Sequence, residues 1–280
     1  MMTLKQKNNT EISETSKFCC IGAGAMGAAI IKGLVSNKTF NASEILVLDL
    51  DQEKLASLKK ELGINTAQDY NELKEQINPD TFIMLAVKPQ VFDKVLESLS
   101  GIKNPLISIA AGIKIEAITK VFADNSVFRV MPNTPAQILK AASALSYNSK
   151  ASIEEIEMVK KIFSAIGVCV EVEEKDLDAV TALSGSGPAY VFLMCEAMTQ
   201  AGIKLGLSED TATKLARQTL YGASNLMVET QEEAKALREK VTSPNGTTQA
   251  GLENLIKNDF NEVIATGIEA AFKRSQELSQ

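Results

Sequence analysis

Histidine is absent from the 280-residue sequence, and its absence excludes a large part of enzyme chemistry. A mechanism that uses an imidazole as general base, general acid or metal ligand is ruled out. Neither the usual serine-hydrolase triad nor an ordinary zinc site can be built. We therefore expect no bound metal.

Cysteine is scarce, and its pattern indicates no disulfide framework. The four residues, Cys19, Cys20, Cys169 and Cys195, contain no Cys-x-x-Cys pair. We interpret them as reduced, buried thiols. Cys19 and Cys20 are adjacent on a predicted strand and should point to opposite faces of the sheet.

Long apolar runs and an excess of basic residues are also missing. No segment approaches the ~18 uninterrupted apolar residues that a membrane span needs. With 29 basic and 35 acidic residues, the net charge is −6, which argues against a nucleic acid or an anionic membrane as partner. Residues 1–16 are polar and lack an apolar signal region, so we expect a flexible tail on a cytoplasmic protein.

The first 174 residues alternate between short apolar runs and helical stretches. The runs are apolar on both faces, as in a sheet that helices cover on both sides. The pattern predicts an α/β domain with a mainly parallel sheet. The predicted strands are 17–21, 45–50, 81–87, 106–110, 126–131, 143–147 and 168–172. Predicted helices include 52–62, 91–99 and 153–166, the last opened by a capping box of Ser152 and Glu155.

After about Glu174 the strand signals stop and long helical patterns follow. These patterns cover residues 188–205, 209–228, 232–241, 247–257 and 261–278, and Ser208 fits the N-cap of the second. Such a stretch has too few long-range loops to enclose a core easily alone. We therefore expect its apolar faces to pack against a second copy, as in interwoven homodimers.

A glycine-rich motif directly follows the first predicted strand and opens a helix. It consists of Gly22, Ala23, Gly24, Ala25, Met26 and Gly27. In this strand–turn–helix context it predicts a Rossmann dinucleotide site, with Gly22 in the tight turn, Gly24 facing the pyrophosphate and Gly27 at the helix–strand contact. The helix N-terminus adds free N–H groups. A purely structural glycine turn is the alternative.

Asp49 closes the second predicted strand, 22 residues after Gly27. A carboxylate here accepts hydrogen bonds from the adenosine ribose and repels a 2′-phosphate, and no basic residue follows before Lys54. The sequence therefore favours NADH over NADPH. The alternative is that Asp49 or Asp51 only caps the next helix.

Loops after later strands should complete the cofactor site, because ligands bind at the carboxyl ends of parallel strands. The residues concerned are Ala86, Val87, Lys88, Pro89, Ala110, Ala111 and Gly112. Small side chains there let a nicotinamide–ribose lie against the backbone. Lys88 is either a solvated surface charge or a partner of the cofactor. The loop at 131–135 carries two prolines, whose rigidity suits a wall beside the nicotinamide.

Two segments of the helical half are suited to close contact with a ligand. The run LSGSGPAY, residues 183–190, enters a long helix through small residues. The run VTSPNGTTQAGL, residues 241–252, is a turn that leads straight into a helix. Its free N–H groups and the hydroxyls of Ser243, Thr247 and Thr248 could bind a carboxylate without a fixed cation. A helix-connecting turn with routine N-capping is the alternative.

Five motifs, GAGAMG, AVKPQ, RVMPNTPA, ALSGSGPAY and VTSPNGTTQAGL, together resemble the pyrroline-5-carboxylate reductase family over about residues 17–278. The resemblance implies an α/β Rossmann domain at 17–174 and an all-α dimerisation domain at 175–280. It also implies an interlocked homodimer, with decamers as the common higher assembly, and reduction of 1-pyrroline-5-carboxylate to L-proline with NAD(P)H. Asn71, which follows a further short strand before the predicted strand 81–87, would contact the adenosine. Glu174, Gly246, Thr247 and Thr248 would bind the substrate.

Three positions depart from the family pattern. Asn245 replaces the first glycine of SPGGTT, and we expect it to tolerate left-handed geometry. Ala141 stands where a glycine is usual. Leu50 stands where relatives that prefer NADPH often carry arginine, beside Asp49 where they carry asparagine.

The chemistry of a cyclic imine suits a sequence without histidine. Its nitrogen can be protonated before hydride arrives, so no residue needs to be a strong acid. Thr248 is then the expected catalytic residue, through a hydrogen bond to the ring nitrogen. One alternative is another two-domain NAD(P)-dependent imine or β-hydroxyacid dehydrogenase, although Lys204 is the only lysine in residues 186–205. The other is a non-catalytic nucleotide-binding relative.

Overall fold

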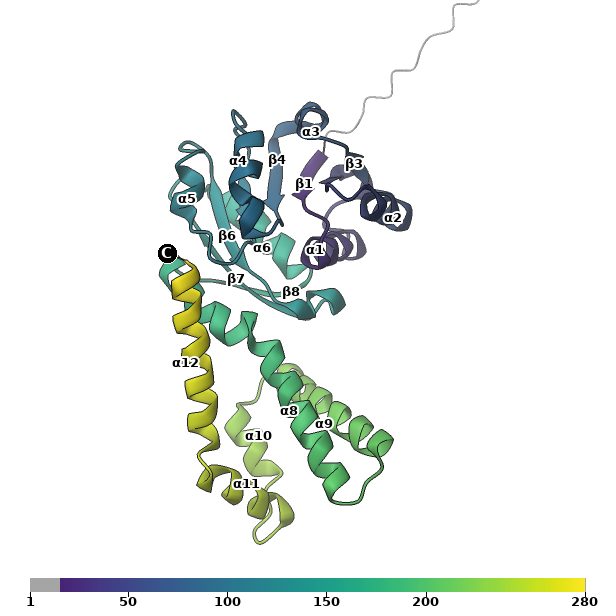
Figure 1. Cartoon of the computed structure of the whole chain (residues 1–280), viewed down its shortest axis with the longest axis vertical. Helices are drawn as coiled ribbons and strands as arrows, with labels where there is room; N and C mark the ends of the chain where they lie inside the picture. Colours follow the sequence, from purple (N-terminus) through teal and green to yellow (C-terminus); the bar gives the residue numbers. More distant parts are fainter. Residues whose placement is uncertain (1–15, 280) are drawn as a thin grey trace, which may run out of the picture. The chain divides into compact units, whose positions relative to one another are not determined.

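A computed structural model describes residues 16–279 of the chain. The chain divides into two compact units, one ending at Leu177 and one spanning 178–278, here called the Rossmann unit and the helical unit. The expected tail at 1–16 lies outside the described residues except for Ser16, which is the first residue of strand β1 (Figure 1).

An eight-stranded sheet forms the Rossmann unit, in the order β3-β2-β1-β4-β5-β6-β7-β8. Its strands are β1 (Ser16–Ile21), β2 (Ile45–Leu48), β3 (Asn65–Ala67), β4 (Ile77–Leu85), β5 (Leu106–Ser108), β6 (Val127–Met131), β7 (Ala141–Tyr147) and β8 (Gly167–Glu171). All neighbours pair in parallel except β6 and β7, which confirms the mainly parallel sheet. The connection between β6 and β7, residues 132–140, is too short for a parallel crossover.

Helices cover both faces of this sheet (Figure 1). They are α1 (Ala25–Ser36), α2 (Gln52–Leu62), α3 (Tyr70–Gln76), α4 (Phe92–Ser98), α5 (Ile115–Thr119) and α6 (Ile153–Ser164). One cluster of buried side chains packs under α1, α2 and α6, and a second packs under α3, α4 and α5. The predicted capping box of Ser152 and Glu155 opens α6.

The cysteines of β1 point to opposite faces, as predicted. Cys20 belongs to the cluster under α1 and Cys19 to the cluster under α4. Both are free and buried, and burial raises the pKa of each thiol well above its ordinary value. Cys169 and Cys195 are also free but only half-buried, so the expectation of burial is wrong for these two.

Two strands differ from the sequence pattern. β3 was not among the strands predicted by residue range, because it has only three residues and the first two are polar. The apolar run of β8 predicted a strand buried on both faces, but one face is exposed: Val168 and Val170 are 62% and 55% exposed. β8 lies at the edge of the sheet, and no helix of the described part of the Rossmann unit covers that face of these residues.

Asparagine side chains tie the strands together at the amino end of the sheet. Asn104 donates to the carbonyl oxygens of Asn78 and Thr81, at 2.6 and 2.9 Å. Asn125 donates to the carbonyl of Asn104 at 2.9 Å, and Asn148 donates to that of Asn125 at 3.0 Å. This network satisfies backbone carbonyls in the first half of β4 and just before β5 and β6.

The helical unit begins with a π-helical turn, Thr181–Gly185, and continues through five helices (Figure 1). These are α8 (Gly187–Lys204), α9 (Glu209–Thr230), α10 (Ala234–Lys240), α11 (Thr247–Lys257) and α12 (Phe260–Leu278); α7 (Leu177–Val180) precedes the π turn. Ser208 caps α9 as predicted, accepting from the Thr211 N–H at 3.2 Å. Across residues 16–279, no helix is both long and apolar enough to cross a membrane.

Candidate functional site

Strands β2, β1, β4 and β5 end in register at one edge of the sheet. Leu48 pairs with Ile21, Ile21 with Leu85, and Leu85 with Ser108. The residues that follow these positions therefore meet along one edge of the sheet. This brings together the glycine turn, Asp49, the segment from Ala86 and the segment from Ile109. The sequence predicted these loops as one site, and the strand register brings them to one edge.

The glycines of the turn between β1 and α1 occupy distinct environments. Gly22 has a φ of +103°, and a Cβ there would lie 2.5 Å from the carbonyl oxygen of Ala86. A Cβ on Gly27 would lie 2.2 Å from the Gly22 oxygen, so helix and turn touch through backbone. Gly24 differs, because among the described residues no heavy atom lies within 4 Å of its Cβ position and no side chain caps α1 there. The turn thus leaves open space in front of free N–H groups.

Asp49 lies directly against this turn. Its Oδ2 accepts the Ala23 N–H at 2.5 Å, and its Oδ1 accepts the Asp51 N–H at 2.8 Å. The capping role belongs to Asp51 instead, whose carboxylate accepts the Lys54 N–H at 3.1 Å and opens α2. That hydrogen bond and the Lys54 side chain lower the pKa of Asp51. Of the two readings of Asp49, the structure favours the position beside the glycine turn.

The remaining predicted cofactor residues lie at the same edge. The Ala86 N–H donates to the Ile21 oxygen at 2.8 Å, while Lys88 is exposed just before a short 3₁₀ turn. Gly112 has a φ of +79° in the loop between β5 and α5. Asn71 is exposed in the first turn of α3, which follows β3, and Ala67 of β3 pairs with Leu48.

Glu174 is held inside the Rossmann unit. Its Oε1 accepts the Ile115 N–H at 2.7 Å and the Arg129 Nη1–H at 3.2 Å. Arg129 lies on β6 and is buried. Arg129 was not predicted to have a role, although a charged residue inside an apolar strand run was a usable signal.

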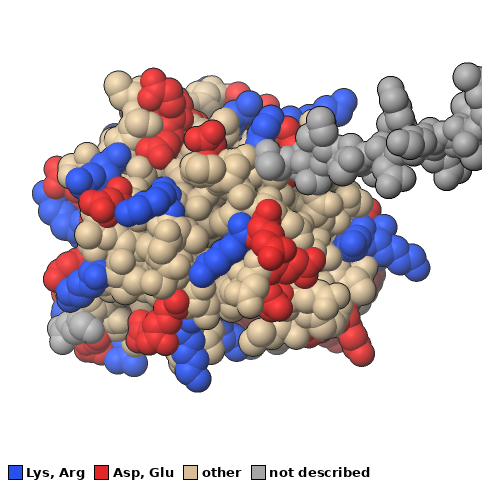
Figure 2. All heavy atoms as spheres, turned by 90° about the horizontal axis from the view of Figure 1, so that it is seen from above, with Lys and Arg blue, Asp and Glu red and all other residues tan. Residues whose placement is uncertain are grey.

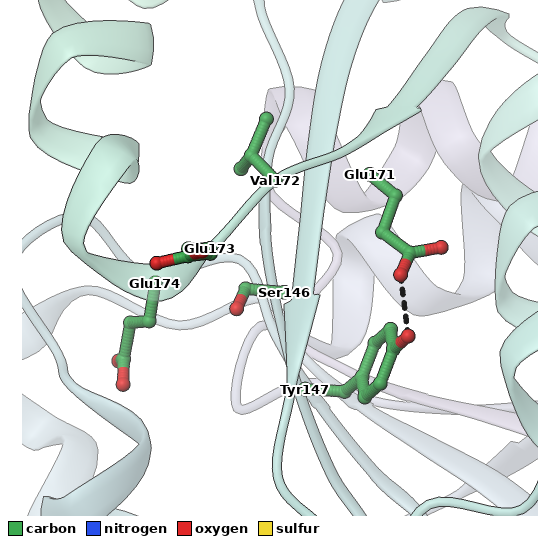
Figure 3. A pocket seen from close by; sticks show the side chains of 6 residues that line it. All are labelled: Ser146, Tyr147, Glu171, Val172, Glu173 and Glu174. Atoms are coloured by element: carbon green, nitrogen blue, oxygen red, sulfur yellow. Dashed lines mark hydrogen bonds between the residues drawn. The ribbon is translucent and has the colours of Figure 1, made fainter.

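An acidic cavity of about 510 Å³ lies beside Glu174 (Figure 3). It is lined by Ser146, Tyr147, Glu171, Val172, Glu173 and Glu174. The Tyr147 hydroxyl donates to Glu171, and Lys160 pairs with Glu171 at 2.9 Å. These contacts, the hydrogen bond first, lower the pKa of Glu171. The other two carboxylates of its wall are also paired, Glu173 with Lys175 at 2.6 Å and Glu174 with Arg129 at 3.2 Å.

The turn before α11 has the geometry that its sequence predicts. Asn245 has a φ of +58°, the left-handed conformation expected at the position of the missing glycine. Gly246 is the N-cap of α11, and no described side chain caps it. A Cβ on Gly246 would lie 2.4 Å from Ser243 Oγ. The helix therefore begins with unused N–H groups beside the exposed Thr247 and Thr248.

Gln249 supports this turn and was not singled out from the sequence. Its Oε1 accepts the Asn245 N–H at 2.7 Å, and its Nε2 donates to Glu253 at 2.7 Å. The spacing of a glutamine three residues after an N-cap is a capping signal that could have indicated this contact. Gln249 thus fixes the residue just before Gly246.

The small-residue segment before α8 forms the π-helical turn. The Ser186 N–H donates to the Thr181 oxygen at 2.8 Å, and the Tyr190 hydroxyl donates to the Ala182 oxygen at 3.1 Å. Such π turns are frequent at functional sites. An apolar cavity of about 410 Å³ lies beside it within the helical unit, against α12.

Acidic and basic side chains are interspersed on the face of the molecule drawn in Figure 2. Among the coloured residues there, no continuous basic patch stands out.

Known proteins resemble both units of the chain. Residues 174–278 match the family model described as pyrroline-5-carboxylate reductase dimerisation, and residues 17–112 match the one described as NADP oxidoreductase, coenzyme F420-dependent. Pyrroline-5-carboxylate reductase of Synechocystis sp. is 43% identical over 262 residues, which cover 93% of this chain and 97% of the relative. That of Arabidopsis thaliana is 36% identical over 271 residues, covering 96% and 97%.

Solved structures agree with these relatives. A pyrroline-5-carboxylate reductase from Coxiella burnetii has a TM-score of 0.87 at 33% identity and covers 95% of this chain and 99% of its own. Plasmodium falciparum pyrroline carboxylate reductase with NADP bound has a TM-score of 0.81 at 28% identity, with 96% and 99% covered. The resemblance drawn from the five motifs is confirmed. The chain belongs to the pyrroline-5-carboxylate reductase family.

Proposed function

We propose that this chain reduces 1-pyrroline-5-carboxylate to L-proline with NAD(P)H. The observation that carries the proposal is family membership across both units, with the SPNGTT turn intact at an uncapped helix start. No comparable support exists for a β-hydroxyacid dehydrogenase, since Lys204 lies at the far end of α8. The intact turn also argues against a non-catalytic relative.

The glycine turn fits a dinucleotide. The open space at Gly24 lets a pyrophosphate approach the free N–H groups of α1, which also present the positive end of the helix dipole. Ala86–Pro89 and Ala110–Gly112 offer backbone at the neighbouring strand ends for the nicotinamide–ribose. When bound, the reduced nicotinamide supplies the hydride.

The α11 turn fits the substrate carboxylate. Gly246, Thr247 and Thr248 present N–H groups and hydroxyls without a cation, and a helix start favours an anion. The Thr248 hydroxyl can accept a hydrogen bond from the protonated ring nitrogen, which would restrict the orientation of the ring. Since the imine arrives protonated, no strong acid is required of the chain.

The proposal includes a preference for NADH. Asp49 places a carboxylate beside the glycine turn, and exposed Leu50 offers no cation for a 2′-phosphate. The Plasmodium structure contains NADP, and the preference proposed for this chain differs from it. The double variant D49N/L50R should shift the ratio of kcat/KM for NADPH over NADH upward by about 10-fold, the effect of one charge contact. A single variant K54A, one turn away, should leave the ratio unchanged.

We also propose a homodimer formed through the helical unit, whose residues match a dimerisation family. Assembly to a decamer and action in the cytoplasm stay predictions.

One assay tests the proposed activity. Purified full-length chain should oxidise NADH, and more slowly NADPH, only when 1-pyrroline-5-carboxylate is added, and proline should accumulate in equal amount. A chain that binds NADH and leaves it unoxidised in the presence of the imino acid overturns the proposal.

A further inference from the structure

We infer that Glu174 is a positioning residue of the cofactor site: it fixes the loop between β5 and α5, and so governs NADH affinity rather than contacting the imino acid. The inference rests on the proposed function, because that function places the nicotinamide at Ala110–Gly112. It replaces the role in substrate binding that the family resemblance suggests for Glu174.

The loop is short and is held at both ends. It runs from Ile109 to Lys114, between Ser108 of β5 and Ile115 of α5. β5 fixes its first end through pairing with β4 and β6. At its second end, the Ile115 N–H donates to Glu174 Oε1 at 2.7 Å. Glu174 is 59 positions further along the chain, so this contact is a long-range anchor.

Within the loop, the backbone is already constrained. Gly112 has a φ of +79°, and the Ile113 N–H donates to the Ala110 oxygen at 3.4 Å. Ile115 is buried and belongs to the core cluster under α4 and α5. A displacement at Ile115 must therefore be taken up by the few residues before it, which include Ala110–Gly112.

Arg129 fixes the carboxylate of Glu174. It lies on β6, where it pairs with Ser108 of β5, and only 6% of it is exposed. Its Nη1 lies 3.2 Å from the same Oε1 that accepts the Ile115 N–H. A buried guanidinium requires a counter-charge, and the strand holds it rigidly. A connected path thus runs from β6 through Arg129 and Glu174 to the loop.

Contact with the substrate is the competing role, and the existing contacts of Glu174 argue against it. Glu174, Glu173 and Glu171 line one cavity (Figure 3), and each is already paired with a cation, Arg129, Lys175 and Lys160 in turn. Figure 3 shows Glu174 on the other side of this cavity from the Tyr147–Glu171 pair. Its observed partners are a backbone N–H and a buried arginine.

Equilibrium binding of NADH to the full-length protein, without imino acid, tests the inference. E174A should weaken NADH binding by about 10-fold, because the anchor at Ile115 is lost. E174Q removes the counter-charge of Arg129 but keeps an acceptor oxygen for the Ile115 N–H, so it should weaken NADH binding less than E174A does. E173A is the matched control: Glu173 is adjacent, exposed and paired only with Lys175 in the described chain, and its NADH affinity should not change.

A second pair of variants removes the donor and keeps the ion pair. Lys114 has a ψ of 154°, which suits a residue before proline, and Ile115 is the first residue of α5, where proline is tolerated. I115P therefore deletes the N–H, while I115A removes the same apolar side chain and keeps the N–H. I115P should bind NADH about 5-fold more weakly than I115A. This comparison holds even if E174A does not fold.

The kinetic split separates the two roles. The inference expects KM for NADH to rise in E174A and I115P, with KM for the imino acid close to that of the wild type. It is overturned if E174A raises only KM for the imino acid, or if I115P and I115A bind NADH equally. Wild-type protein that binds NADH without oxidising it refutes the proposed activity alone, because the binding comparison needs no turnover.

Discussion

The two units differ in how far they bury their large apolar side chains. In the Rossmann unit, helices on both faces of the sheet close two clusters of fully buried aliphatic and aromatic residues. In the described helical unit, the buried apolar residues are alanines, while large ones such as Phe192 are 60% exposed. The first unit is therefore complete by itself, whereas the second exposes the surface that a partner should cover. Substitutions in the first should affect folding, and those in the second assembly and catalysis.

The largest expected effect comes from the backbone contact inside the Rossmann unit. G22A forces a side chain into a φ of +103° and within 2.5 Å of the Ala86 oxygen. We expect a loss of about 3 kcal/mol or more of unfolding free energy, measured by denaturant titration, with no NADH binding. G24A is the control, because its Cβ meets open space. It should leave stability within ~0.5 kcal/mol and weaken only cofactor binding; equal destabilisation by both would contradict this reading of the turn.

The next effect concerns the exposed surface of the helical unit. F192D places a charge among the exposed residues Val191, Phe192 and Leu193 of α8. If these are buried in the dimer, the dissociation constant should rise by at least ~30-fold, corresponding to about 2 kcal/mol. Sedimentation velocity across a dilution series would measure it. I153D in the Rossmann unit also charges an exposed residue and should leave the dimer intact; equal dissociation by the two variants would show that α8 has no special part in it.

A substitution of Thr248 in the helical unit should lower activity without lowering stability. The Thr248 side chain is exposed and caps no helix in the part of the chain that the structure describes, so T248A should leave the melting temperature unchanged. kcat/KM for the imino acid should fall by ~10–100-fold, the range of one positioned hydrogen bond. T248S keeps the hydroxyl and should recover most of the rate. Unchanged steady-state kinetics of T248A would remove Thr248 from the mechanism.

The sequence predicted the elements of the Rossmann unit better than the side-chain contacts between residues far apart in the chain. Strand and helix positions followed from apolar periodicity, and the roles of Gly22 and Gly27 followed from a motif whose geometry is local. Arg129 and Glu174 are 45 positions apart, and nothing in either local pattern brings them together. The exposure of Val168 and Val170 was missed because an apolar run has the same composition at the edge of a sheet as at its centre.

The turn before α11 shows the same difference between what local sequence predicts and what it does not. Asn245 was correctly expected to adopt left-handed geometry, because the residue type alone permits it. Gln249 carried a weaker signal, because its spacing from the N-cap fits a capping side chain, but which backbone N–H it reaches depends on a rotamer that only the structure shows. Functional residues that act through backbone are therefore visible in sequence, whereas the side chains that hold them are found in the structure.

Substitution of Gln249 gives the smallest predicted effect. It tests how much one exposed hydrogen bond contributes to the order of the turn before α11. In Q249A the Asn245 N–H loses its acceptor, and one exposed hydrogen bond of about 1 kcal/mol corresponds to a ~3–5-fold lower kcat/KM for the imino acid. KM for NADH should not move. E253A removes the partner of the Gln249 amide but leaves the contact to Asn245, so its effect should be smaller. Initial rates over a range of imino acid concentrations separate the two, and an E253A defect as large as that of Q249A would mean that the support of this turn runs along α11 rather than through Asn245.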